Sequence, residues 1–181
     1  MYICPELRLI YLAQPRTASR ACSQFLQAQT PLRRTGGHHD MDLAELRFRR
    51  RDGWKVVTTV RNHWDIIVSW WHHNPRWFNP PQGTNDFGLY AREFTRSRDN
   101  HYVRAHRMYW EFQPEATDIV RYESLWDDLA RVTGLPVTDQ ERQHFIGKSD
   151  RKPYREYYDA ETREFIGEYY ATEIEEYGYT F

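Results

Sequence analysis

Hydrophobic residues gather in short apolar runs, and each run is followed by a stretch with apolar residues at helical spacing. Three runs, Leu7–Gln14, Trp54–Asn62 and Thr117–Glu123, have the short apolar character of buried strands. Strand–helix units that recur three times favour a parallel sheet covered by helices. The pattern therefore predicts an α/β fold.

Start and stop signals define several of the helices. Asn62 is a suitable N-cap for a helix over 63–73, and Asp65 near its start suits the helix dipole. Gly134 is expected to end the helix that begins near residue 124. Further helices are predicted over 20–29, 42–50, 87–112 and 139–145, and prolines and glycines predict a loop over 74–88. The tail, 160–177, is predicted as a helix that places five residues on one face: Phe165, Ile166, Tyr169, Tyr170 and Ile174.

The composition is that of an ordinary globular chain. At 181 residues, 40% of them hydrophobic, it can bury one core, and we expect a single domain over residues 1–181. We expect neither a membrane span nor a signal peptide, because no apolar run has the required length or flanks. Cys4 and Cys22 form no disulfide framework, which favours the cytoplasm. A net charge of −1 argues against a general nucleic-acid binder.

Arginine dominates the basic residues. Among 25 basic side chains, only Lys55, Lys148 and Lys152 are lysines. Guanidinium groups are planar and permanently charged, which suits bidentate contacts with phosphate or sulfate. A GC-rich genome produces the same bias, so composition alone does not predict an anion site.

The first predicted strand leads into the segment PRTASR, residues 15–20, and then into a helix. A strand–loop–helix corner directs free backbone N–H groups and the positive end of the helix dipole towards the loop. Arg16, Thr17, Ser19 and Arg20 add cationic and hydroxyl donors there. The loop lacks the glycines and the lysine of a Walker A motif. Taken alone, it fits an anion site and an ordinary helix cap equally well.

A second polar position follows the second predicted strand. Arg61 ends that strand, and Ser69 lies two helical turns further on. Open α/β folds bind ligands at the carboxyl edge of the sheet, where both residues are expected. The sequence thus predicts an anion-binding α/β domain with two arginine-bearing loops.

Together, PRTAS and VRNHWDIIVSWW resemble the sulfotransferases that use 3′-phosphoadenosine 5′-phosphosulfate (PAPS). In that family, a P-[KR]-[ST]-[GA]-[ST]-[TR] loop holds the 5′-phosphosulfate, and an R-N-P-x-D-x-x-x-S-[WY] segment holds the 3′-phosphate. RYESLWDDLARVTGLP and the tail from Lys152 resemble later parts of its carbohydrate-acting and bacterial members. The resemblance extends over Leu7–Phe181. It implies a three-layer α/β/α fold with a small parallel sheet, similar to that of P-loop NTPases.

The resemblance also implies roles for matching residues. Arg16 occupies the catalytic Lys/Arg position, where it would stabilise the leaving 5′-phosphate. The rest of the loop, Thr17, Ala18, Ser19 and Arg20, would hold the 5′-phosphosulfate. Arg61 and Ser69 would hold the 3′-phosphate. Ser149, Arg151 and Lys152 match late family residues that approach the nucleotide. For Trp64 and Tyr154, adenine stacking and a place in the core both remain open.

Histidines that follow the first helix are candidate catalytic bases. His39, and after it His38, fall where related sequences have a histidine, and an imidazole near pKa 6.5 suits proton removal at neutral pH. A surface histidine without a role is the alternative, and Asp40 and Glu123 are other candidates. Neither these histidines nor the pair His72–His73 has the ligand spacing of a metal site, so no metal is expected.

Three functions follow from this reading. The first is a PAPS-dependent sulfotransferase that acts on a hydroxyl of a carbohydrate or small molecule. The second is an inactive nucleotide-binding module of the same fold, and the third is a P-loop-like kinase.

Ala18 stands where the family has a glycine, and the fit of the loop to the family pattern fails if that position needs a positive φ. His63 replaces the usual proline, a mild change. No nucleic-acid or membrane partner is expected, and a homodimer is compatible with the aromatic content.

Overall fold

The structure is a computed structural model that describes residues 1–37, 41–73, 86–96, 113–143 and 150–181. Its contacts divide the chain into two compact units. Unit 1 comprises Met1–Val60 and Ala105–Lys148, and unit 2 comprises Arg61–Arg104 and Ser149–Phe181. Each unit therefore combines an early and a late part of the sequence.

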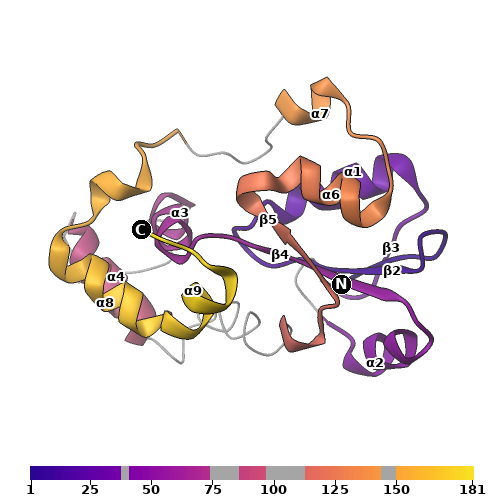
Figure 1. Cartoon of the computed structure of the whole chain (residues 1–181), viewed down its shortest axis with the longest axis horizontal. Helices are drawn as coiled ribbons and strands as arrows, with labels where there is room; N and C mark the ends of the chain where they lie inside the picture. The colour runs from indigo at the N-terminus through magenta and orange to yellow at the C-terminus, as the bar shows by residue number, and fades with distance from the viewer. Residues whose placement is uncertain (38–40, 74–85, 97–112, 144–149) are drawn as a thin grey trace. The chain divides into compact units, whose positions relative to one another are not determined.

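Unit 1 contains a sheet whose described strands are β1 (Tyr2–Cys4), β2 (Leu9–Leu12), β3 (Arg33–Arg34), β4 (Lys55–Val60) and β5 (Asp118–Arg121). Their order is β3-β1-β2-β4-β5 (Figure 1). β4 pairs in parallel with β2 on one side and with β5 on the other, which confirms the three predicted strands and the parallel sheet. β1 and β3 extend the sheet in the antiparallel sense. They were not predicted, because two or three residues are too few to show a periodicity.

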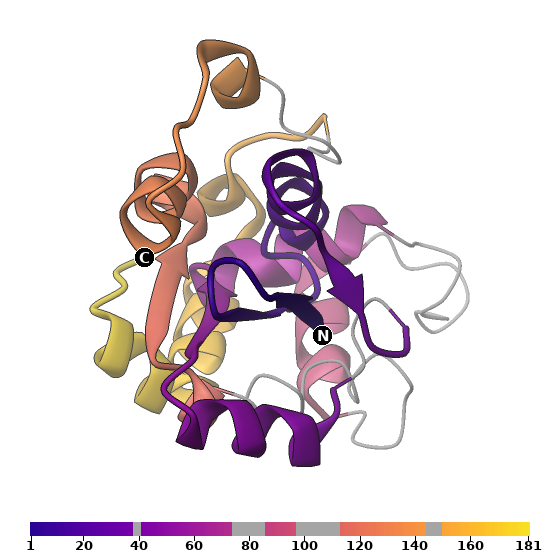
Figure 2. The same cartoon turned by 90° about the vertical axis from the view of Figure 1, so that its right-hand side faces the viewer.

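The helices of unit 1 in its described part are α1 (Ser19–Gln29), α2 (Leu43–Arg51), α6 (Leu125–Thr133) and α7 (Asp139–Gln143), with 3₁₀ turns η1 (Gln113–Glu115) and η2 (Tyr122–Ser124). Helices α1 and α6 cover one face of the sheet, and α2 covers the other (Figures 1 and 2). Along β2, Leu9 and Tyr11 pack towards α1 and α6, whereas Ile10 and Leu12 share a core with Leu46 of α2. A strand that is buried on both faces reads as a continuous apolar run. The α/β/α layers are thus confirmed.

Unit 2 is helical in its described part and consists of α3 (His63–His73), α4 (Phe87–Arg96), η3 (Tyr154–Tyr157), α8 (Ala160–Tyr169) and α9 (Ala171–Tyr177). Its core is rich in aromatic rings. The ring centroids of Trp71 and Tyr90 lie 4.8 Å apart, and so do those of Phe87 and Tyr158. Gly167 allows α8 to approach α3, because a Cβ there would lie 3.2 Å from the Trp64 ring.

The predicted helix ends are confirmed where the structure describes them. The Asn62 side-chain oxygen accepts a hydrogen bond from the backbone N–H of Trp64 at 3.0 Å, as expected of an N-cap. Gly134 adopts φ 71° after the last turn of α6. The helix predicted over 87–112 is observed up to Arg96. The rest of it, and most of the loop predicted over 74–88, lie outside the described residues.

The prediction of one continuous tail helix with a single apolar face is wrong. The chain leaves helical geometry at Tyr170, with φ −108° and ψ 23°, and continues as the separate helix α9. This break changes which side chains face inwards. Ile166 and Tyr170 are buried, whereas Tyr169 is 42% exposed.

Two further observations bear on the chemical character of the chain. No helix in the described part has both the length and the apolar character needed to cross a membrane. Cys4 and Cys22 are free and buried, and burial raises the pKa of each thiol to about 12. The thiols therefore stay protonated and unreactive at neutral pH.

Glu173 in α9 gives the fold a pH dependence. Its side chain is 3% exposed, and its Oε2 has no hydrogen-bond partner among the described residues. Burial raises the pKa of this carboxyl group from 4.5 to about 7. Below pH 4.5 the group is neutral in both states and carries no penalty. As the pH rises to 7 and above, the unfolded state loses the proton more easily, and the folded state is destabilised.

We therefore expect Glu173→Gln to increase the free energy of unfolding at pH 8 by up to about 3 kcal/mol, with little effect near pH 4.5. Urea unfolding of both chains at several pH values between 4.5 and 8 measures this difference. A constant difference across that range would contradict the assignment.

Candidate functional site

The loop between β2 and α1 has a backbone suited to an anion. Arg16 and Ala18 both have φ 65°, whereas Thr17 between them does not have a positive φ. Position 18 thus has the positive φ that was expected to spoil the fit, yet alanine adopts it without a glycine. Backbones that alternate left- and right-handed residues form concavities that bind anions. Ala18 is also the N-cap residue of α1 and has no side-chain acceptor to offer the first-turn N–H groups. These donors therefore suit a negatively charged ligand.

The side chains of this loop differ in their surroundings. Arg20 is exposed and Arg16 is half-buried, so both guanidinium groups can contact solvent or a ligand. Ser19 is buried at the start of α1. Thr17 is fully buried, and its hydroxyl donates to the carbonyl oxygen of Gln14 at 2.9 Å. Of the hydroxyls predicted to hold an anion, that of Thr17 is thus engaged by the protein itself.

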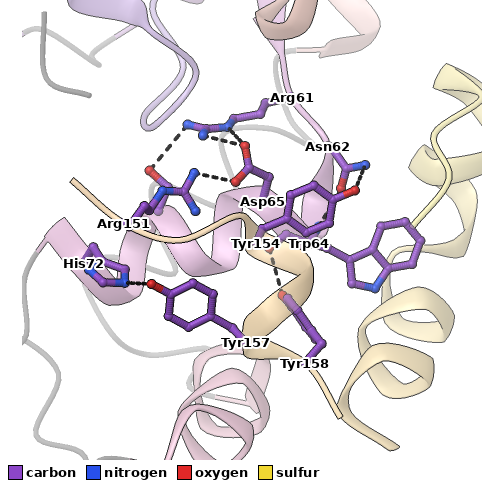
Figure 3. Close-up of polar contacts among 10 residues, drawn as sticks. Arg61, Asn62, Trp64, Asp65, His72, Arg151, Tyr154, Tyr157 and Tyr158 are labelled. Atoms are coloured by element: carbon purple, nitrogen blue, oxygen red, sulfur yellow. Dashed lines mark hydrogen bonds and ion pairs between the residues drawn. The ribbon is translucent and has the colours of Figure 1, made fainter. Parts of the chain in front are cut away.

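A second group of polar side chains forms in unit 2. Arg61 precedes the Asn62 cap of α3, and its Nε and Nη2 donate to one oxygen of Asp65, at 2.8 and 2.6 Å. Its Nη1 lies 3.4 Å from the hydroxyl oxygen of Ser69. Arg151, from the segment before η3, donates to the other Asp65 oxygen (Figure 3). We call these four residues the arginine cluster.

The arginine cluster has little contact with solvent. The side chains of Arg61, Arg151 and Asp65 are 6%, 11% and 14% exposed. Two guanidinium groups thus share one carboxylate in a place with little water. In addition, Nη1 of Arg151 is buried without a hydrogen-bond partner in the described structure. Buried charges and donors of this kind are costly unless a further partner is present, so the cluster suits an anion.

Asp65 is the member of this cluster that the sequence interpretation missed. The sequence suggested only that it favours the helix dipole. In the structure it joins two arginines that lie 90 residues apart in the chain, and it orients both. The spacing of Arg61 and Asp65, four residues apart at a helix start, was the available signal. Nothing in the sequence linked Arg151 to either.

η3 is held against α3 by contacts of residues that follow Arg151 in the chain. The Tyr158 hydroxyl donates to the Trp64 carbonyl oxygen at 2.8 Å. The Asn62 side-chain amide donates to the Thr180 carbonyl oxygen at 3.0 Å and lies 3.4 Å from the Tyr154 hydroxyl. These contacts fix the segment that carries Arg151 (Figure 3).

Trp64 and Tyr154 belong to this packing. Trp64 is 6% exposed, and its ring lies edge-on to Phe181 at 5.5 Å. The Tyr154 ring is edge-on to Phe181 at 5.7 Å, and the Arg155 guanidinium lies 5.0 Å from its centre. Of the two interpretations of Trp64, a place in the core is therefore the one observed.

The candidate bases His38, His39 and Asp40, and also Ser149, lie outside the described residues. Lys152 is exposed, and so is Glu123 in η2. Nε2 of His72 lies 2.8 Å from the Tyr157 hydroxyl oxygen, and burial, together with the charge of Arg151, lowers the pKa of this imidazole.

The described residues contain no group of three or more His, Cys, Asp or Glu side chains that could hold a metal ion.

Unit 1 also has an open groove of about 210 Å³ between α1, α6 and α7. Phe25 and Trp126 line it, with their ring centroids 6.0 Å apart, and Gln140 lies at its α7 side. None of the predicted site residues lines this groove.

The left-handed backbone at Ala18 leads to a stability prediction. An L-residue in this conformation is less favourable than glycine, because its Cβ crowds the following carbonyl oxygen. Ala18→Gly relieves this crowding but increases the entropy of the unfolded chain. We expect a net gain of about 0.5–1 kcal/mol in the free energy of unfolding, measured by urea titration. Ala18→Val serves as the opposite control and should destabilise. A loss of stability on Ala18→Gly would show that the position does not need a positive φ.

Comparison with known proteins adds the family. No curated protein and no solved structure matches the chain. The sulfotransferase domain family, however, matches residues 21–136, which is more than half of the chain. The matched part contains Arg61, Asp65 and Ser69, begins just after the loop of residues 15–18, and ends before Arg151. Together with the α/β fold, this match shows that the chain belongs to the sulfotransferase domain family.

Proposed function

We propose that the protein transfers a sulfuryl group from PAPS to a hydroxyl of a carbohydrate or small molecule, with both units acting as one sulfotransferase domain. The observation that carries the proposal is the buried Nη1 of Arg151, which has no hydrogen-bond partner in the described structure and lies in the arginine cluster. A phosphate monoester would supply an acceptor for this group and a counter-charge for the guanidinium. The 3′-phosphate distinguishes PAPS from common adenine nucleotides, so it fits this role.

The loop between β2 and α1 is the proposed place of the 5′-phosphosulfate. The left-handed residues Arg16 and Ala18, together with the start of α1, support this assignment. Ser19 and Arg20 would add a hydroxyl and a positive charge. Lys152, which is exposed, would contribute through longer-range attraction to the nucleotide.

PAPS supplies an activated sulfuryl group whose S–O bond to the 5′-phosphate breaks while a new S–O bond forms to the acceptor oxygen. Arg16 would donate hydrogen bonds to the phosphate as its negative charge grows, and its pKa is too high for it to act as an acid. The acceptor proton would pass to His39 or, alternatively, His38. Positioning and charge neutralisation then supply most of the acceleration, as in phosphoryl transfer.

The first test is Arg61→Met. Removal of this buried guanidinium should weaken binding of adenosine 3′,5′-bisphosphate (PAP) about 10- to 100-fold, because a charge-assisted contact is lost. Isothermal titration calorimetry measures the affinity. The matched control is Arg92→Met on α4, whose ion pair with the exposed Glu161 is peripheral. It should leave PAP affinity unchanged.

The same titration with ADP and with ATP–Mg²⁺ distinguishes the functions. A clear preference of the unaltered protein for PAP supports the proposal. A preference for ATP–Mg²⁺ would favour the kinase, and equal loss of PAP affinity in both arginine variants would contradict the assignment of the 3′-phosphate to the arginine cluster.

The second test is Arg16→Ala. If Arg16 acts mainly on charge that develops during transfer, this change should abolish turnover while PAP affinity falls only slightly. Turnover is measured as the release of PAP from PAPS in the presence of a mixture of hydroxyl compounds. The mixture is one in which the unaltered protein is active. The exposed Arg34 of β3 offers a control, Arg34→Ala, that should retain full turnover. Normal turnover by Arg16→Ala would contradict the role of Arg16.

A further inference from the structure

A chain of buried hydroxyl groups lies directly beneath the loop between β2 and α1. The Thr17 hydroxyl oxygen is 2.9 Å from the Gln14 carbonyl oxygen and 2.7 Å from the Thr59 hydroxyl oxygen. The Thr59 hydroxyl is in turn 3.0 Å from that of Tyr11. Thr17, Thr59 and Tyr11 are each 0% exposed, so water does not compete for these bonds.

The direction of this chain follows from counting protons. A carbonyl oxygen can only accept, so Thr17 gives its single proton to Gln14. The bond between the two threonines must then use the Thr59 proton, and the bond between Thr59 and Tyr11 must use the Tyr11 proton. All three hydroxyl protons are therefore engaged.

This proton count limits what Thr17 can do for a ligand. A phosphosulfate only accepts hydrogen bonds at neutral pH. The Thr17 hydroxyl has no second proton to offer, so it cannot donate to such a ligand without breaking its bond to Gln14. Its contribution is instead to hold the loop in place. Arg16 and Ala18, the two residues with φ 65°, flank it directly.

We propose that Thr59 of β4 is a positioning residue for the 5′-phosphate, supported by Tyr11 of β2. Thr59 acts through Thr17, whose hydroxyl it binds, and so anchors the middle of the loop to the sheet. This anchor keeps the left-handed residues on either side of Thr17, and their backbone N–H groups, in the arrangement that binds the anion. This inference rests on the proposed function of the loop. It adds Thr59, which contacts no ligand itself. It also changes the role of Thr17, which anchors the loop and does not donate a hydrogen bond to the ligand.

The test compares two ligands that differ only at the 5′ position, PAP and adenosine 3′-monophosphate. Thr59→Val removes the hydroxyl and keeps the shape of the side chain. We expect it to lower PAP affinity about tenfold, the effect of one lost hydrogen bond that orders the loop. The affinity for adenosine 3′-monophosphate should be unchanged, because that ligand has no 5′-phosphate. Thr59→Ser, which keeps the hydroxyl, should restore PAP binding.

Thr58→Val is the matched control. Thr58 is the neighbouring buried residue on β4, and its hydroxyl donates to the Leu12 carbonyl oxygen at 3.2 Å rather than to the loop. This variant should bind both ligands normally. If Thr59→Val does not fold, Tyr11→Phe carries the same test with a smaller expected loss of about threefold for PAP alone.

Each outcome decides the inference. A loss confined to PAP in Thr59→Val, with rescue by Thr59→Ser, supports it. Equal affinity of Thr59→Val and the unaltered protein for PAP overturns it, and so does an equal loss for both ligands. If the unaltered protein does not bind PAP, the proposed function fails and the positioning role fails with it. That result differs from the others because it appears before any substitution is made.

Discussion

Parallel hydrogen bonding between β2 and β4 pairs Leu12 with Thr58. Thr59, the next residue of β4, therefore lies beside the point where the chain leaves β2 and enters the loop. Because Tyr11, Thr58 and Thr59 are buried, their hydroxyl groups must bond with other buried groups of the protein. Thr59 reaches the loop on one face of the strand, and Thr58 reaches the β2 backbone on the other. The same pairing that builds the sheet therefore also shapes the loop.

Unit 2 places its charged groups by a different means. Aromatic side chains of α3, η3 and the C-terminal residues pack together and hold the segment that precedes η3. This packing keeps Arg151 within reach of Asp65 and Arg61. Buried ion pairs contribute little net stability, since desolvation offsets much of their attraction. The cluster also keeps Nη1 of Arg151 buried without a hydrogen-bond partner in the described structure, which agrees with the proposed role in binding an anion.

Local signals in the sequence were sufficient for several elements. The three parallel strands, the Asn62 cap and the Gly134 helix end depend on residues that are adjacent in the chain, and all were predicted. The motif around Arg61 was also readable, and it lies in the part that matches the sulfotransferase family. By contrast, the break at Tyr170 arises because α9 packs as its own helix against α8, and helical periodicity cannot reveal a change of direction.

The sequence by itself determined the α/β class, the family and the two segments for which we propose anion binding, because each of these is encoded by neighbouring residues. Only the tertiary structure decided that Asp65 joins Arg61 to Arg151, that Ala18 adopts the left-handed conformation usually reserved for glycine, and that the Thr17 hydroxyl is held by Thr59. These features depend on contacts between residues that lie far apart in the chain, or on a backbone conformation that such contacts maintain. Their energies become decisive only when water is excluded and every buried donor must find an acceptor.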